Sequence, residues 1–131
     1  MSNDIEIQKN LLETLDKILE RMAAKANEMG LPGVCVAGVF DDENSLLSRS
    51  KDCGKLFKNN WNYLAIAFSK VSEMCATLQD SGDPSRSEIH GEFAYPGGAV
   101  KQVGAVHYVV AFSGAKGEED LLISRYGMEI L

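Results

Sequence analysis

The chain has 131 residues, of which 45% are hydrophobic and 24% are charged, and this composition is typical of one globular domain that spans residues 1–131. Its formal net charge of -6 argues against a protein that binds nucleic acid or an anionic membrane without specificity, because both partners require a cationic surface. No apolar run approaches the roughly 18 residues that a membrane-spanning helix needs, and residues 1–4 lack the basic start and apolar core of a signal peptide. We therefore expect neither a nucleic-acid nor a membrane partner.

The cysteine pattern indicates a reducing compartment. Cys35, Cys53 and Cys75 are odd in number and far apart in the sequence. This pattern favours free thiols over a disulfide framework or a zinc site. We therefore expect a cytoplasmic protein without a metal site.

The first part of the chain predicts a long helix followed by a hairpin. Apolar side chains recur at helical spacing over residues 5–29, and Gly30 and Pro32 end the helix. The almost wholly apolar run 34–40 is typical of a central strand that is covered on both faces. Turn-forming residues follow it, so we expect the chain to return as a second strand over residues 45–49.

A second helix is expected over residues 60–78, capped by Asn59 or Asn60. Its apolar face comprises Trp61, Leu64, Phe68, Val71, Cys75 and Leu78. The polar connection over residues 80–97 is long for a small domain, which predicts either a functional segment or a hidden short strand at residues 92–95.

The last part of the chain predicts a second hairpin and a closing helix. Residues 99–102 and 105–113 form its strands, with a turn near Val103–Gly104, and residues 118–131 form the helix. The order is therefore helix, hairpin, helix, hairpin, helix. This order predicts an α+β domain with a mainly antiparallel sheet and helices packed on it.

The segment VAFSGAKGEED at residues 110–120 has the outline of a phosphate-binding loop, because two glycines bracket a lysine ahead of a helix. It lacks the G-x-x-x-x-G-K-[ST] spacing, and no Ser or Thr follows Lys116 to hold magnesium. The helix also opens with three carboxylates, which complement its dipole and repel a phosphate. We interpret the segment as a tight strand-to-helix turn that Gly114 and Gly117 permit.

Lys70 and the pair Gly97–Gly98 are candidate ligand-binding positions. Lys70 follows the mostly apolar stretch 66–69, so its ammonium group either reaches water along the helix surface or meets an anionic group of a ligand. Gly97 and Gly98 either accommodate a bend or let a ligand approach the backbone.

The two histidines and one cysteine are the remaining candidates. His90 lies in the long polar connection and His107 in the last strand, and neither belongs to a metal-ligand cluster. Each is either a structural histidine or a ligand or acid–base group. Cys53, near Lys51 and Lys55, is an ordinary loop cysteine or one half of a Cys–His nucleophile pair.

Taken in order, the motifs resemble those of the GlcG/HbpS family, which includes the C-terminal domain of PduO-type proteins. The matching stretches are Val39-Phe40-Asp41, Ile66-Ala67-Phe68-Ser69-Lys70-Val71, Pro96-Gly97-Gly98, Phe112-Ser113-Gly114 and Glu118-Glu119-Asp120. The resemblance implies a profilin-like domain, with an antiparallel sheet flanked by helices, and assembly into dimers or larger rings.

The resemblance also implies a small-ligand-binding protein. Some relatives bind haem, which makes haem the candidate cofactor, and a few are linked to haem degradation. Others accompany glycolate or diol metabolism, so the alternative is a small cytosolic enzyme or an accessory protein of that metabolism. The expected ligand-binding residues are Lys70, His90, Gly97, Gly98 and His107. No nucleophile–base pair is recognisable, so no catalytic residue is assigned.

This chain departs from the family pattern in three places. The hairpin turn after Pro96-Gly97-Gly98 is shortened, and Asn44 stands where many relatives have glycine. The first helix also has no histidine. These departures leave His90 and His107 as the candidate axial ligands for haem.

Self-association is expected because the apolar residues exceed what one small sheet can bury. The expected surface includes the closing helix or the outer side of helix 60–78, with Trp61 and Tyr63 as anchors.

Overall fold

The computed structural model describes residues 2–43 and 45–131, so Asn44 lies outside the described residues. The elements in chain order are α1 (Ser2–Met29), β1 (Val34–Phe40), β2 (Leu47–Asp52), β3 (Phe57–Lys58), β4 (Trp61–Asn62), α2 (Tyr63–Thr77), β5 (Gly98–Val103), β6 (Val106–Ser113) and α3 (Gly117–Met128). Strands β2, β1, β6 and β5 form, in that order, a sheet in which neighbouring strands are antiparallel. The predicted α+β fold with an antiparallel sheet flanked by helices is therefore confirmed.

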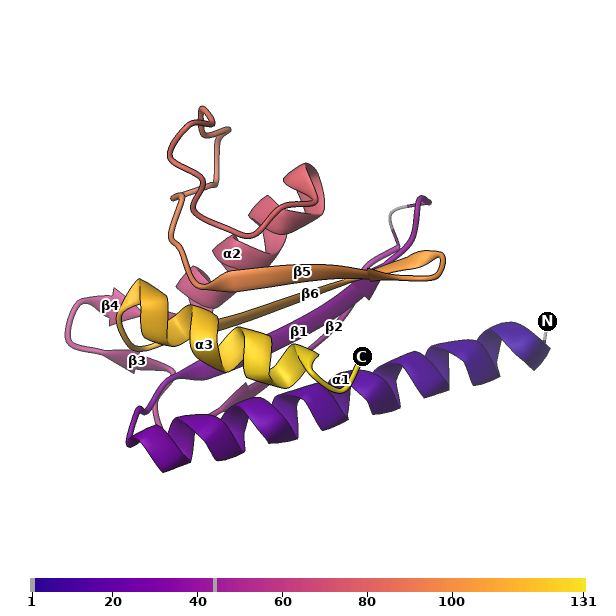
Figure 1. Ribbon diagram of the computed structural model, residues 1–131, viewed down its shortest axis with the longest axis horizontal. Helices are drawn as coiled ribbons and strands as arrows, with labels where there is room; N and C mark the ends of the chain where they lie inside the picture. The colour runs from indigo at the N-terminus through magenta and orange to yellow at the C-terminus, as the bar shows by residue number, and fades with distance from the viewer. Residues whose placement is uncertain (1, 44) are drawn as a thin grey trace.

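The sheet separates two apolar layers. Helices α1 and α3 cover one face, and α2 covers the other (Figure 1). All of β1 is buried, and its side chains alternate between the two layers, with Cys35 in the α1–α3 layer and Val36 in the α2 layer. This confirms the prediction of a central strand covered on both faces.

An apolar stripe holds α1 against the sheet. Its buried residues include Leu15, Ile18, Leu19, Met22 and Ala26. α3 approaches α1 at Gly127, where a Cβ atom would lie only 2.5 Å from Met22 Cγ. The N-terminal turns of α1 extend past the sheet, and Ile5 and Ile7 are exposed there (Figure 1). None of the described helices combines the length and the apolarity that crossing a membrane requires.

Between β2 and α2 the chain forms a small hairpin that the sequence pattern did not predict. Strands β3 and β4 pair there, and Asn59, with φ 56°, lies in the turn between them. Helix α2 is instead capped by Asn62, whose side chain accepts a hydrogen bond from the Ala65 N–H at 3.0 Å. The predicted cap at Asn59 or Asn60 is wrong because the hairpin uses both residues for its turn.

Helix α2 buries only part of the predicted face. Val71 is buried, and Leu64 and Cys75 pack against the α2 layer, as predicted. Phe68 and Leu78 are 38% and 49% exposed, and Trp61 precedes the helix in β4. Lys70 and Glu73 are buried instead. Their polar groups tolerate burial because each has partners that replace water.

Other elements also differ from the prediction. β2 begins at Leu47 and continues to Asp52, beyond the predicted strand. Residues 92–95 form no strand, because Ala94 adopts a positive φ of 55° that breaks the extended backbone. α3 ends at Met128, before the last residues of the chain.

Replacing Ile18 by Ala tests the packing of α1 on the sheet. Ile18 is fully buried, so the change removes apolar contacts and leaves a cavity, and we expect the free energy of unfolding to fall by about 2–5 kcal/mol. Urea denaturation followed by circular dichroism measures this loss. Ile5 on the same helix is 74% exposed, and Ile5→Ala should change the same quantity by at most about 0.5 kcal/mol. Equal losses in the two variants would contradict this placement of α1.

Candidate functional site

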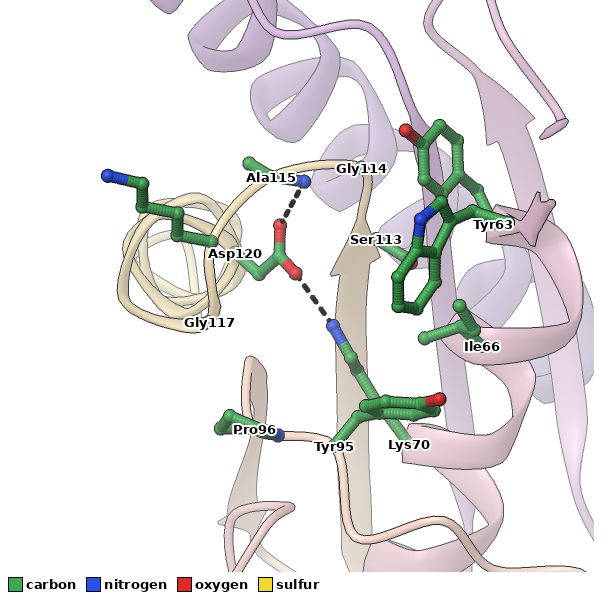
Figure 2. A pocket seen from close by; sticks show the side chains of 12 residues that line it. Tyr63, Ile66, Lys70, Tyr95, Pro96, Ser113, Gly114, Ala115, Gly117 and Asp120 are labelled. Carbon is green, nitrogen blue, oxygen red and sulfur yellow. Dashed lines mark hydrogen bonds and ion pairs between the residues drawn. The ribbon is translucent and has the colours of Figure 1, made fainter. Parts of the chain in front are cut away.

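A cavity of about 320 Å³ opens where the start of α2, the β6–α3 turn and the segment before β5 meet (Figure 2). We call it the Lys70 cavity. It is lined by Trp61, Tyr63, Ile66, Lys70, Tyr95, Pro96, Ser113, Gly114, Ala115, Lys116, Gly117 and Asp120. Its volume lies at the lower end of the range for sites that bind small molecules, which is roughly 300–1,000 Å³.

The polar part of the Lys70 cavity is a buried ion pair. Lys70 Nζ donates to Asp120 Oδ2 at 2.9 Å and to the Phe112 carbonyl oxygen at 2.7 Å. The other carboxylate oxygen of Asp120 accepts a hydrogen bond from the Ala115 N–H at 3.1 Å. The side chains of Lys70 and Asp120 are only 1% and 5% exposed. The pair therefore links α2, β6 and α3 at one point (Figure 2).

The rest of the lining is largely aromatic and apolar. Trp61 belongs to β4 and is 54% exposed, Tyr63 and Ile66 come from the first turn of α2, and Tyr95 comes from the segment before β5. Such a site offers flat apolar walls for the body of a ligand and a few polar groups that orient it.

The β6–α3 turn forms one wall of the cavity because it packs closely on two prolines. A Cβ atom on Gly114, whose φ is 147°, would lie 2.4 Å from the Pro32 carbonyl oxygen. One on Gly117 would lie 2.6 Å from Pro96 Cγ. These glycines permit the turn, as the sequence indicated, and the same turn also lines the cavity.

The acidic start of α3 has more than one role. Glu119 accepts a hydrogen bond from the Lys116 N–H at 3.2 Å and so caps the helix. Asp120 instead turns inward to Lys70 and the Ala115 N–H. The three carboxylates do lie in the first turn of α3, as predicted. Asp120 has a further role that the sequence pattern did not indicate, because a buried cation is its partner.

Burial shifts the pKa of each partner in the direction that favours its uncharged form. Desolvation lowers the pKa of Lys70, and the Asp120 carboxylate opposes that shift. Desolvation also raises the pKa of Asp120 from its ordinary 3.8 to about 6, although the Lys70 ammonium acts in the opposite direction. Since the folded pKa of Asp120 is the higher one, its contribution to stability is present below its ordinary pKa and is lost as the pH rises through about 6. Above that pH the pair is neutral overall, and below it the site carries a net positive charge.

Of the expected site residues, Lys70 and Gly97 lie together. A Cβ atom on Gly97, whose φ is 123°, would lie 2.8 Å from Lys70 Nζ and 2.5 Å from the Asp120 Cβ. Gly97 is therefore a glycine because the ion pair leaves no room for a side chain. The alternative in which Lys70 extends to water is wrong, because the residue is 2% exposed and its ammonium group bonds inside the protein.

Gly98 supports the site from outside. Its N–H donates to Ser81 Oγ at 2.9 Å, and a Cβ atom there would lie 2.6 Å from Met74 Cε. It is not part of the cavity lining.

The two histidines lie away from the Lys70 cavity. His107 stacks on Phe40 with ring centroids 5.2 Å apart, and its Nε2 lies 3.9 Å from Asp42 Oδ1. It stands near the start of β6, whereas Ser113 of the cavity ends that strand, about 20 Å away at the rise of an extended chain. His90 is exposed in the loop before β5. Neither histidine is part of the cavity lining.

Asp120 is a site residue that the sequence motifs did not identify, although a signal was present. Asp120 shares a helical face with Ile123, Ser124 and Gly127, and all four are buried. A carboxylate on the buried stripe of a helix indicates an internal partner. The sulfur of Cys53, the candidate for a Cys–His pair, lies 3.4 Å from Cys35 Sγ.

No family model and no curated protein matches the chain. Six solved chains match its fold, among them the following three. Protein ORFY of Klebsiella pneumoniae, of the family DUF336, has a TM-score of 0.69 and 18% identity over 90% of this chain and 87% of that one. The PduOC:heme complex has a TM-score of 0.64 and 14% identity over 91% and 92% of the two chains. A double mutant of Streptomyces reticuli HbpS has a TM-score of 0.61 and 22% identity over 92% and 85%.

These are the proteins to which the sequence motifs pointed, and the resemblance is confirmed as a shared fold. Because the sequence identities are only 14–22%, the similarity shows a shared fold and nothing more.

A titration of Asp120 tests the electrostatics of the ion pair. We expect its carboxyl carbon, followed by carbon-13 NMR, to titrate with a midpoint near 6. In Lys70→Met the midpoint should rise further, because the nearby positive charge that favours the carboxylate is gone. Replacing exposed Lys9 by Met should leave the midpoint unchanged. A wild-type midpoint near 4 would contradict the expectation that desolvation of Asp120 outweighs its ion pair with Lys70.

Proposed function

We propose that the domain binds a small molecule that presents an anionic oxygen group to Lys70 and a flat apolar body to the aromatic walls. The observation that carries this proposal is the buried Lys70–Asp120 pair in the lining of an otherwise largely apolar cavity. Perturbed pKa values in a concave site favour a functional role over a purely structural one.

The hydrogen bonds of Lys70 support the same proposal. An ammonium group has three N–H donors, and the described residues supply acceptors for two of them, on Phe112 and Asp120. The third donor serves a ligand oxygen in the cavity that Lys70 lines. A charge-assisted hydrogen bond of this kind contributes about 1.5–3 kcal/mol.

An enzyme acting on a small hydroxy acid or aldehyde, or an accessory protein of glycolate or diol metabolism, is the second candidate. One observation favours the enzyme, namely that Asp120 has a pKa of about 6 and lies beside a lysine whose pKa is lowered. A carboxyl group that titrates near neutrality is suited to general acid–base catalysis. Turnover of such a metabolite, lost in Asp120→Asn, would favour this candidate over a binding protein.

Haem is the candidate cofactor because one protein with this fold, PduOC, was crystallised as a heme complex. Haem iron in proteins is held by His, Cys, Met or Tyr side chains. Only Tyr63 and Tyr95 among these residue types line the Lys70 cavity, and His90 and His107 lie elsewhere. Haem in the Lys70 cavity would therefore depend on a tyrosine ligand, whereas haem held by a histidine would need a site elsewhere, at His90 or His107.

Self-association is the proposed quaternary state. Phe57, Trp61 and Phe68 are 68%, 54% and 38% exposed on the β3–β4 hairpin and α2, and Leu122 of α3 is 46% exposed. Exposed apolar groups of this size are typical of an interface. The two expected surfaces therefore both carry candidate anchors.

Binding of benzoate tests the proposed ligand class, with neutral benzamide as its matched control. Trp61 is the only tryptophan of the chain and lines the cavity, so we expect benzoate to change its fluorescence in a saturable manner. Lys70→Met should weaken binding by about tenfold or more, because the charge-assisted bond is lost. Lys9→Met should have no effect, and affinity should rise as the pH falls through about 6 and Asp120 becomes neutral.

Equal binding of benzoate and benzamide, or equal binding by wild type and Lys70→Met, would refute an anion site at Lys70. Native mass spectrometry of the purified protein complements this test, since a co-purifying small molecule would identify the ligand directly.

Titration with hemin tests the haem candidate separately. We expect no saturable Soret shift that depends on Lys70, because the cavity supplies no histidine. A shift that survives gel filtration and disappears in His90→Ala or His107→Ala would instead make haem the ligand and would move the site away from the Lys70 cavity.

Light scattering tests self-association. We expect a mass above that of the 14.3 kDa chain at micromolar concentration, and a lower mass in Trp61→Ser if the hairpin surface forms the contact. A mass that stays at the monomer value on concentration would rule out self-association.

A further inference from the structure

Two thiols lie side by side at the junction of β1 and the chain that leaves β2. Cys35 is fully buried in β1, and Cys53 is partly exposed just after β2. Their sulfur atoms are 3.4 Å apart. Neither is part of a disulfide, and the pair lies outside the Lys70 cavity.

The strand register explains why these thiols meet. Cys35 is directly opposite Lys51, and the Cys53 N–H donates to the Gly33 carbonyl oxygen at 2.7 Å. Cys53 is therefore the diagonal neighbour of Cys35 on the same face of the sheet, where side chains can interact. The register places them together although they are 18 positions apart.

The local backbone favours closure of the pair. An S–S bond is about 2.05 Å long, so the sulfurs must approach by about 1.4 Å. Cys35 is held within the central strand, but Cys53 lies in a bend beyond the end of β2. Gly54, with φ 95°, follows it, and the space beside Gly54 is open except for Pro32 at 4.0 Å. Cys53 is therefore less constrained by its surroundings than Cys35.

We propose that Cys35 and Cys53 form an oxidation site that closes to an intramolecular disulfide when the protein meets a peroxide. The two thiols differ in their exposure to solvent, and this difference determines which sulfur reacts with the peroxide first. Cys53 is reached from solvent, whereas Cys35 is covered by the α1–α3 layer.

The hydrogen bond between the thiols supports this order. It lowers the pKa of Cys53, against the effects of burial and of Asp52, while Lys51 adds a smaller lowering. The same hydrogen bond raises the pKa of Cys35, and burial raises it further. The accessible sulfur is therefore the better nucleophile, since the thiolate is the reactive form.

The reaction balances with hydrogen peroxide as the oxidant. The Cys53 thiolate attacks one peroxide oxygen, the O–O bond breaks, and the leaving hydroxide takes up a proton to become water. Cys53 is then a sulfenic acid. The Cys35 sulfur displaces its hydroxyl group, the S–S bond forms, and the thiol proton of Cys35 leaves with the hydroxyl as a second water. In total the two thiols lose two electrons, and one hydrogen peroxide gains them and is reduced to two waters.

The position of the disulfide connects it to the rest of the molecule. Cys53 begins the segment 53–62, which carries the β3–β4 hairpin and Trp61. A disulfide would tie the base of this segment to the central strand. Intracellular disulfides of this kind are typically regulatory or redox-sensing rather than structural.

Trypsin digestion without reduction tests the proposal on the intact protein. Cleavage after Lys25, Arg49, Lys51 and Lys55 separates Cys35 from Cys53, and Cys75 falls on a third peptide. After treatment with equimolar hydrogen peroxide, we expect peptides 26–49 and 52–55 joined by a disulfide, and dithiothreitol should restore both thiols. Cys75→Ser is the matched control and should form the same cross-link to the same extent.

Cys53→Ser should lose the cross-link and leave Cys35 as a free thiol at the same peroxide dose. Circular dichroism confirms that this variant is folded, so the result does not depend on a substitution in the core at Cys35. Joining of peptides other than these two, a cross-link only between chains, or oxidation of Cys53 to a sulfinic acid with Cys35 still reduced would each overturn the proposal.

Discussion

The buried pair of Lys70 and Asp120 is the interaction on which the arrangement of this domain depends most. Removing two charges from water is costly, and their attraction offsets that cost only when the remaining polar atoms are also bonded. The Phe112 carbonyl and the Ala115 N–H provide those bonds. The pair thus fixes α2, the end of β6 and the start of α3 relative to one another. Gly97 follows from the same constraint, because the pair occupies the volume that a side chain there would need.

The pair also gives the Lys70 cavity its chemistry. Desolvation brings the pKa of Asp120 to about 6, so the charge of the site changes close to neutral pH. The cavity therefore combines a titratable polar group with aromatic walls from β4, α2 and the segment before β5. A structure that needed only a link between α2 and α3 would be as well served by apolar packing, since buried ion pairs are seldom more stabilising than apolar side chains of similar size.

The layers that cover the two faces of the sheet differ in size and in polarity. The α1–α3 layer is a continuous apolar core that contains the thiol of Cys35 and packs against Cys53. The α2 layer is smaller and borders the buried charges. The β3–β4 hairpin lies between these regions along the chain, with Cys53 before it and the cavity residue Tyr63 after it. The segment from Cys53 to Tyr63 thus connects the thiol pair, the exposed aromatic residues of the hairpin and the Lys70 cavity along the chain.

The sequence by itself determined the elements whose side chains repeat with a clear period. The stripe of α1, its end at Gly30, the buried strand β1 and the turn glycines of the β6–α3 connection were all predictable, because each depends on neighbours within a few residues. The β3–β4 hairpin was not predictable in this way, since its strands are too short to show a period. Lys70 and Asp120 are 50 positions apart and Cys35 and Cys53 are 18 apart. The register of the sheet and the face on which α2 packs decided that these side chains meet. They also placed His107 at the end of β6 that is far from the Lys70 cavity. Local periodicity could not show this, because contacts between distant residues depend on how the elements pack.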